Sequence, residues 1–185
     1  PLEPDEVDQL IPSWIATRAD LDRVEQDNIA RALRWLRDRR ASSDELLSER
    51  FVRQLHEQMF KDVWKWAGRY RVTNKNIGVD RTLIVEEIGK LLADATYWVE
   101  NDVFPPDEIA VRLHHGLVSI HPFSNGNGRH TRLAADTLVE SLRAPTFSWG
   151  AELVGDPVEL RRSYIEALQA ADAGEIGPLL AFAGS

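Results

Sequence analysis

The chain alternates between long amphipathic stretches and short polar connections, and within most stretches the apolar residues recur every three or four positions. This spacing is typical of helices that bury one face. Between residues 20 and 39, one broad stripe is formed by Leu21, Val24, Ile29, Leu33 and Leu36, and most of the other positions are charged or polar. The pattern therefore predicts a helix over 20–39 that packs through this stripe.

The same reasoning extends along the chain. Ser42 or Ser43 is a suitable N-cap for a helix that runs to about Phe60. Further helices are predicted over 82–99, from Pro105-Pro106 to about Ile120, over 129–143, over 157–171, and briefly near Pro178. Neither internal repeats nor low-complexity tracts interrupt the pattern. The sequence therefore predicts an all-α fold.

One segment departs from the helical pattern. Residues 69–81 include Thr73, Asn74, Lys75, Asn76 and Ile77, followed by a glycine. Asn and Gly at this density favour a turn, and the flanking apolar residues suit short extended pieces. We interpret the segment as a small β-hairpin, although on these residues alone a plain surface loop is the favoured alternative.

The most informative stretch is residues 121–132, which reads His-Pro-Phe-Ser-Asn-Gly-Asn-Gly-Arg-His-Thr-Arg. Gly126 and Gly128 can adopt backbone angles closed to other residues, so that neighbouring N–H groups can converge on an anion. A helix is predicted to begin here, and its N-terminus favours phosphate. Arg129 and Arg132 share a face just inside that terminus, where two cations oppose the helix dipole but suit an anion clamp.

These residues resemble the signature of the Fic family, His-x-Phe-x-Asp/Glu-Gly-Asn-Gly-Arg-x-x-Arg. Seven of its positions agree, and one differs because Asn125 stands where the family has an acidic residue. The segment Trp66-Ala67-Gly68-Arg69-Tyr70-Arg71 and the stretch from Tyr164 to Leu179 also resemble parts of Fic proteins. The resemblance implies a single Fic-like helical bundle over 1–185, with a Fic core over 50–183 and a less securely matched N-terminal helical part over 1–49.

The resemblance also implies an enzyme, a protein adenylyltransferase that moves AMP from ATP to a Ser, Thr or Tyr hydroxyl of a target protein. His121 would accept the hydroxyl proton, because imidazole titrates near neutral pH, and Arg129 and Arg132 would neutralise charge on the phosphates. The nucleotide site implied by the motif comprises Phe123, Asn125, Gly126, Asn127, Gly128, Arg129 and Arg132, with the Asn127 amide as an added donor. The side chain of Phe123 is expected to pack inward.

In the family a flap beside the active site pairs with the backbone of the target protein. The resemblance places that flap at Thr73–Ile77, where it would add the target segment as a strand. Three alternatives stay open: a nucleotide-binding or partner-docking module with weak or no turnover, transfer of another phosphate-containing group, and removal of AMP.

The identity of residue 125 affects how strongly the site is expected to bind Mg²⁺. Mg²⁺ prefers carboxylate and phosphate oxygens, and an amide oxygen adds no negative charge. ATP is therefore expected as co-substrate, with Mg²⁺ weakly held at Asn125 or held mainly by the nucleotide. His114, His115 and His130 do not have the spacing of a zinc site.

Many Fic proteins are restrained by a glutamate that pairs with the second motif arginine, here Arg132. The chain lacks a clean copy of the restraining pattern, but Glu25 has a suitable place in the first predicted helix. The two hypotheses are that Glu25 restrains Arg132 from within the chain, or that a separate antitoxin-like partner does so.

The composition of the chain limits the classes of partner and of site that can be expected. The formal net charge is −8 and the pI is about 5.1, which argues against nucleic acid as a general partner. A membrane span is not expected, since the chain has no sufficiently long apolar run. The absence of cysteine excludes disulfides and thiolate metal sites and fits a cytoplasmic location.

Overall fold

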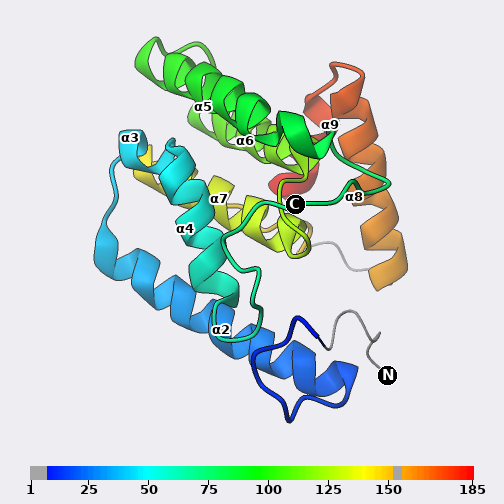
Figure 1. Ribbon diagram of the computed structural model, residues 1–185. Helices are drawn as coiled ribbons and strands as arrows, with labels where there is room; N and C mark the ends of the chain where they lie inside the picture. Colours follow the sequence, from blue (N-terminus) through cyan, green and yellow to red (C-terminus); the bar gives the residue numbers. More distant parts are fainter. Residues whose placement is uncertain (1–7, 152–155) are drawn as a thin grey trace.

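The computed structural model describes residues 8–151 and 156–185, and the regular secondary structure of these residues is almost entirely helical (Figure 1). The bounds of these elements are α2 (Arg18–Arg39), α3 (Ser43–Leu46), α4 (Glu49–Phe60), the 3₁₀ turn η1 (Arg81–Leu83), α5 (Ile84–Glu100), α6 (Pro106–Ile120), α7 (Asn127–Ser141), α8 (Pro157–Asp172) and α9 (Gly177–Ala183). The predicted all-α fold is confirmed.

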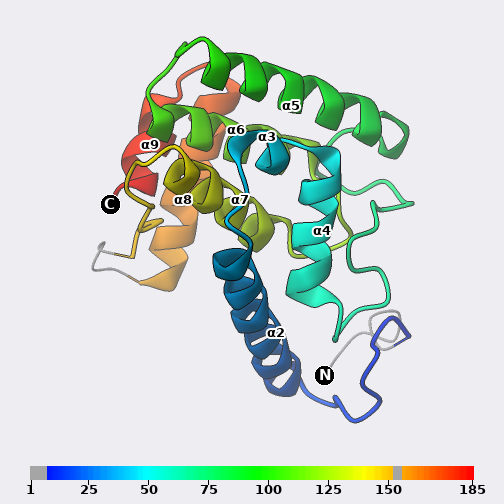
Figure 2. The ribbon, with the colours of Figure 1, turned by 90° about the vertical axis from the view of Figure 1, so that its left-hand side faces the viewer.

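Helix α7, which begins in the signature stretch, lies in the middle of the molecule. In both Figure 1 and Figure 2, α4 lies on one side of α7 and α8 on the other, with α2 below and α5 above. Side chains from the N-terminal part through α7 share one hydrophobic core, in which Leu55, Phe60, Ile88, Leu117 and Leu138 are fully buried. Helices α8 and α9 close a smaller cluster against α6.

The predicted helix over 42–60 is divided into two. Its first turn is α3, and the chain then turns at Leu47 before α4 begins after Ser48. The hydroxyl of Ser48 accepts a hydrogen bond from the N–H of Phe51 at 3.1 Å, which caps α4. The sequence predicted the correct buried face of α4 but missed this internal N-cap.

Helix α2 was predicted with the correct span but with a partly wrong buried face. Its buried residues are Leu21, Glu25, Asn28 and Ala32, whereas Leu33 is exposed. Asn28 explains the rotation, because its amide donates to the carbonyl of Gln58 and its oxygen accepts from the N–H of Asp62. These bonds fix α2 to the end of α4 and bring Glu25 inward with it.

The segment between α4 and η1 does not form the predicted β-hairpin. Residues 72–80 contain bends without a strand ladder, and the isolated β-bridges among the described residues are Leu10 with Trp64 and Tyr70 with Phe123. The segment is held instead by side chains, since Asn74 bonds to Asp80 and to the N–H of Arg81. We call residues 72–80 the flap.

Among the helices of the described residues, none combines the length and the apolarity that crossing a bilayer requires.

Candidate functional site

The flap is fastened to the chain on both sides of His121. At its start, the N–H of Arg71 donates to the carbonyl of Pro122 at 2.9 Å. At its end, the N–H of Val79 donates to the carbonyl of Ile120 at 3.3 Å. The two ends of the flap are therefore bonded to the residues that directly precede and follow His121, and the residues in the middle of the flap are exposed.

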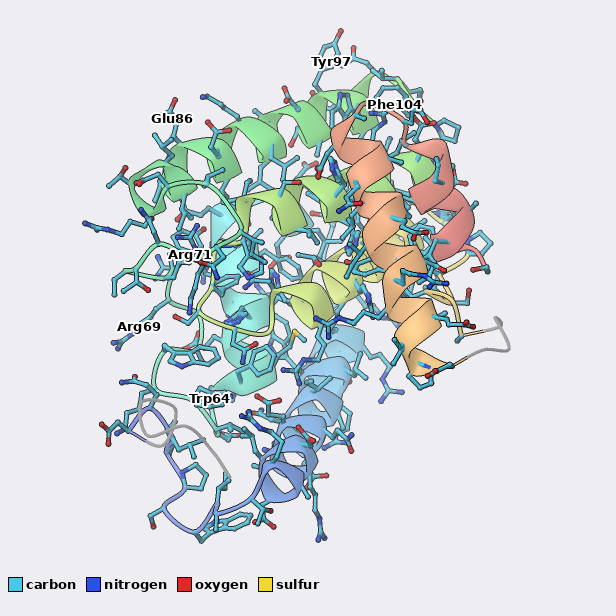
Figure 3. All side chains as sticks on the ribbon, turned by 90° about the vertical axis from the view of Figure 1, so that its right-hand side faces the viewer. Trp64, Arg69, Arg71, Glu86, Tyr97 and Phe104 are labelled. Atoms are coloured by element: carbon cyan, nitrogen blue, oxygen red, sulfur yellow. The ribbon has the colours of Figure 1, made fainter. Side chains whose placement is uncertain are left out.

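The side chain of Arg71 completes the attachment. Its Nε donates to the carbonyl of His121 at 2.8 Å and its Nη1 donates to the carbonyl of Thr73 at 2.9 Å, while Nη2 bonds to the carbonyl of Val79. Arg71 is 3% exposed, and Figure 3 shows it within the molecule, whereas Arg69 extends outward. Sequence reasoning placed Arg71 in the family resemblance but did not give it this role.

Gly78 permits the close approach of the flap to His121. Its φ of +92° is in the left-handed region, and a Cβ built on it would lie 2.7 Å from Cβ of His121. A side chain at this position would therefore force the flap or the histidine to move.

His121 ends α6 in a left-handed conformation, with φ of 53°, and its Nδ1 is buried. Nε2 is consequently the ring nitrogen that can meet a substrate hydroxyl. Burial lowers the pKa of His121 below its ordinary value, and the charges of Arg71 and Lys75 act in the same direction. The imidazole is therefore neutral at pH 7 and able to accept a proton.

The loop after His121 is closed by Asn127. Its Oδ1 accepts from the N–H of Phe123 at 3.0 Å, and its Nδ2 donates to the carbonyl of the same residue at 2.9 Å. Both polar atoms of this amide therefore serve the loop, and one N–H of Nδ2 is left for the predicted contact with the nucleotide. Phe123 is fully buried, as expected, so its contribution to the predicted nucleotide site is to fix the loop from inside.

His56 supports the loop from α4, a role that sequence reasoning did not give it. Its ring stacks on Phe123 with centroids 3.7 Å apart. Nδ1 accepts a hydrogen bond from the N–H of Gly68, and Nε2 lies 3.0 Å from the carbonyl oxygen of Asn125. Because Nδ1 is an acceptor, Nε2 carries the proton. Burial holds the pKa of His56 well below its ordinary value, which maintains this neutral form.

The helix terminus offers main-chain donors. Gly126 has φ of 76° and a Cβ there would lie 2.5 Å from the ring of Phe60, so both conformation and space require glycine. Gly128, in contrast, is an ordinary residue of α7, and the unusual angles predicted for it are not observed. The space beside its Cα is open. No hydrogen bond between described residues uses the N–H groups of Asn127, Gly128 and Arg129.

The first motif arginine is already paired. Nη1 of Arg129 lies 2.7 Å from Oε2 of Glu25, and its guanidinium lies over the ring of Phe60. The other oxygen of Glu25 accepts a hydrogen bond from the indole N–H of Trp64 at 2.6 Å. The hypothesis that Glu25 contacts Arg132 is wrong, because Glu25 contacts Arg129, the first arginine of the same motif.

The second motif arginine has different neighbours. Cζ of Arg132 lies 4.6 Å from the ring centroid of Tyr164 and 6.0 Å from that of Trp149. None of the ion pairs between described residues involves Arg132. The two arginines therefore start from one turn of α7 but lie in separate surroundings.

The residues present do not make a metal site of their own. Oδ1 of Asn125 accepts a hydrogen bond from the N–H of Gly126 at 2.7 Å, and its carbonyl oxygen is bonded to His56. The described residues contain no group of three His, Cys, Asp or Glu side chains that could hold a metal ion. The site therefore does not fit the expected Mg²⁺ ligand at Asn125.

The arrangement agrees with comparison to known proteins. The model of the Fic/DOC family matches residues 46–139, which is more than half of the chain. The chain belongs to the Fic/DOC family. The matched region contains the flap, His121 and both motif arginines.

Among curated proteins, this Fic chain is similar to protein adenylyltransferase fic-1 of Caenorhabditis elegans, with 30% identity over 119 residues. That match covers 63% of this chain and 22% of the relative. Protein adenylyltransferase Fic of Nematostella vectensis is 32% identical over 119 residues, which cover 63% of this chain and 26% of the relative. The matched region thus spans about a quarter of the length of these relatives.

Solved structures share the fold. The N-terminal Fic domain of Bep8 from Bartonella sp. 1-1C superposes with a TM-score of 0.74 at 16% identity, over 96% of this chain and 90% of that one. BepC of Bartonella tribocorum, solved with bound AMPPNP, has a TM-score of 0.70 at 18% identity, over 94% and 89% of the two chains. A fragment of C. elegans Fic-1 has a TM-score of 0.67 at 24% identity, over 94% and 50%.

Proposed function

We propose that this chain is a protein adenylyltransferase that transfers AMP from ATP to a Ser, Thr or Tyr hydroxyl of a target protein. The observation that carries the proposal is the setting of His121, a neutral, half-buried imidazole whose neighbours on both sides are gripped by the flap. The names of the curated relatives support the same chemistry.

The transfer proceeds in line at the α-phosphorus. The hydroxyl proton of the target passes to Nε2 of His121 while the hydroxyl oxygen forms a bond to the α-phosphorus. The bond from this phosphorus to the oxygen that bridges to the β-phosphorus breaks, and pyrophosphate leaves. The products are the AMP ester of the target and pyrophosphate, so atoms and charge balance.

The phosphates are bound by the start of α7 in this proposal. The N–H groups of Asn127, Gly128 and Arg129 supply donors at the positive end of the helix, and the open space beside Gly128 admits the phosphate chain. Arg132 supplies charge to the leaving group, and Arg129 joins it once Glu25 has been displaced.

The flap holds the target. The side chains from Thr73 to Ile77 are exposed, and no backbone hydrogen bond between described residues involves Lys75, Asn76 or Ile77. These main-chain groups are available to an added strand. The carbonyl of Thr73 is not, since Arg71 occupies it. We therefore narrow the pairing segment to residues 75–77.

The restraint is internal in this proposal. Glu25 neutralises Arg129 from α2, so the chain in this conformation lacks one phosphate-binding cation. The contact between Glu25 and Arg129 also favours the second candidate, a nucleotide-binding module with weak turnover. Such a module would bind the nucleotide through Arg132 and the helix terminus and would not need His121. The alternative is an antitoxin-like partner that restrains the chain in place of Glu25. The variant Glu25→Gln tests between the two.

The experiment that tests the function is incubation of the purified chain with α-labelled ATP in cell lysate, beside His121→Ala. Label on a protein band that is lost in the variant supports adenylyl transfer, and mass analysis then identifies the modified hydroxyl. Binding of ATP without label in either protein supports the binding module. Label from γ-labelled ATP alone indicates another transferred group.

The metal is tested in the same assay with and without Mg²⁺. We expect the nucleotide to carry the ion and Asn125→Asp to increase the dependence of labelling on Mg²⁺, because a carboxylate adds the charge that an amide lacks. Asn101→Asp, at the end of α5, is the matched control. A cytoplasmic location remains part of this proposal, since a chain without cysteine suits a reducing compartment.

A further inference from the structure

Arg132 is surrounded by a network that no part of the sequence motif supplies. The network consists of Tyr164 from α8, Trp149 from the connection before it, Asp136 from α7 and His114 from α6. We call these four residues the Arg132 clamp. All four lie outside the twelve-residue signature.

Tyr164 contacts the guanidinium of Arg132 through its ring. Its ring lies 4.6 Å from Cζ of Arg132, within the range of a cation–π contact. The ring is itself held, because its hydroxyl lies 3.0 Å from Nε2 of the fully buried His114. A ring that stacks on the face of a guanidinium leaves the N–H groups at its edge able to bind an anion.

Trp149 binds a carboxylate that could otherwise compete for Arg132. Asp136 lies four residues after Arg132 on α7, the spacing at which helical side chains of opposite charge pair. Its carboxylate instead accepts the indole N–H of Trp149, at 3.0 and 3.2 Å to its two oxygens, and the N–H of Phe147 at 3.3 Å. The ring of Trp149 also contacts that of His114 in a tilted arrangement, with centroids 4.6 Å apart, which joins the two halves of the clamp.

The contrast with Arg129 shows what the clamp achieves. Arg129 is held by a carboxylate, which competes with any phosphate. Arg132 is held by aromatic faces, and its Nε is buried without a hydrogen-bond partner. An arginine that is already ordered loses less side-chain entropy when it binds a phosphate, and it does not first have to break an ion pair.

We propose that Tyr164 and Trp149 are positioning residues. They keep Arg132 ordered and free of an ion pair, so that it can bind the terminal phosphates of the nucleotide. The inference rests on the proposed function, in which Arg132 binds the leaving group. Tyr164 acts by stacking, and Trp149 acts by retaining Asp136.

The first test is a double-mutant cycle on ATP binding, measured by calorimetry, with pyrophosphate as a second probe. Tyr164→Leu is expected to weaken ATP binding about tenfold, and Tyr164→Phe, which keeps the ring, by less than about twofold. In an Arg132→Ala background, Tyr164→Leu should have no further effect. Full additivity of the two changes, or equal losses in Tyr164→Phe and Tyr164→Leu, would overturn the stacking role.

The second test uses rescue, which a merely structural role would not give. Trp149→Phe keeps an aromatic face but cannot hold Asp136, so Asp136 is expected to pair with Arg132 and weaken ATP binding about fivefold. Adding Asp136→Asn should restore the affinity. Failure of the double variant to recover would show that Trp149 acts otherwise.

Controls separate this inference from the proposed function. Tyr97→Leu, on the exposed face of α5 in Figure 3, should leave ATP binding unchanged. If Arg132→Ala binds ATP as the unaltered chain does, the proposed role of Arg132 fails and the clamp fails with it. If Arg132→Ala loses affinity while the clamp variants do not, only the clamp is wrong.

Should Tyr164→Leu not fold, Arg132→Lys replaces it as the test variant. Lysine keeps the charge but cannot stack as a plane, so undiminished ATP binding by Arg132→Lys would overturn the proposal.

Discussion

Oε2 of Glu25 lies 2.7 Å from Nη1 of Arg129, and the indole of Trp64 holds the other oxygen of the same carboxylate. Glu25 is only 5% exposed, so this carboxylate depends on its two partners for stabilisation. The ion pair joins α2 to the start of α7 and occupies one of the two cations proposed to bind phosphate.

Glu25→Gln is expected to raise adenylyl transfer about tenfold, because the amide still accepts from Trp64 but no longer attracts Arg129. The measurement is the initial rate of labelling from α-labelled ATP. Glu86→Gln, on the outer face of α5 in Figure 3, is the matched control and should leave the rate unchanged. An unchanged rate in Glu25→Gln, with Arg129 still required, would transfer the restraint to a partner protein.

Gly78→Ala is expected to reduce transfer at least about tenfold, since the added methyl group would lie 2.7 Å from Cβ of His121. Gly174→Ala is a close control, because Gly174 has a similar φ of +94° but no heavy atom within 4 Å of a built Cβ. Both variants bear similar backbone strain, of about 1–2 kcal/mol, and only the first crowds the histidine. Equal activities of the two variants would show that the flap does not need this approach.

In a plot of transfer rate against pH, the fall on the acid side is expected below pH 6.5, because burial and nearby cations lower the pKa of His121. A general base acts when neutral, so the rate falls as the pH falls through this lowered pKa. Removing the charge in Lys75→Ala raises the pKa and moves the fall in rate to higher pH, whereas Lys61→Ala, on an exposed lysine after α4, leaves it in place. A fall in rate that stays at the same pH in Lys75→Ala would assign it to another group.

Three buried histidines are expected to make the fold sensitive to acid. Burial lowers the pKa of His114 to about 3 and that of His130 to about 4, and it lowers that of His56 well below its ordinary value. The unfolded chain therefore binds protons that the folded chain does not, and each histidine lowers the free energy of unfolding by about 1.4 kcal/mol per pH unit as the pH falls from about 6 toward its folded pKa.

His130→Gln measures one of these contributions, because its amide can still donate to the carbonyl of Val52 as Nε2 of His130 does. Between pH 6 and 4.5 its free energy of unfolding, from urea denaturation, should depend on pH less steeply by about 1.4 kcal/mol per unit. Leu138→Ala, a fully buried residue that does not titrate, should lose stability equally at each pH. A slope that is the same in His130→Gln and the unaltered chain would mean that His130 is not kept neutral by folding.

The sequence predicted most of the fold because helical periodicity is a local property. The spans of α2, α5, α6, α7 and α8 follow from apolar spacing, together with Pro at the starts of α6 and α8 and the cap Asp156 before α8. The buried face of α2 did not follow, because Glu25 and Asn28 are polar residues whose burial depends on partners far along the chain. Hydrophobic spacing cannot indicate a polar side chain that is satisfied only in the folded state.

The candidate site divides in the same way. The motif indicated His121, Gly126 and the arginines, since these residue types at this spacing suit one chemistry. The motif did not indicate that the amide of Asn127 serves the loop, that Arg71 fastens the flap, or that His56 supports the carbonyl of Asn125. Each of these contacts involves main-chain atoms, which carry no sequence signature.

The amino-acid sequence by itself therefore determined the helical class, the position of the motif at the start of a helix, and the groups available for chemistry. Only the tertiary structure decided which cation is occupied and which is available. Arg129 and Arg132 are three residues apart in one motif, yet one meets Glu25 and the other meets Tyr164. The physical reason is that packing of α2 and α8 around α7 brings together side chains that are distant in the sequence, and electrostatic and cation–π contacts depend on that proximity in space.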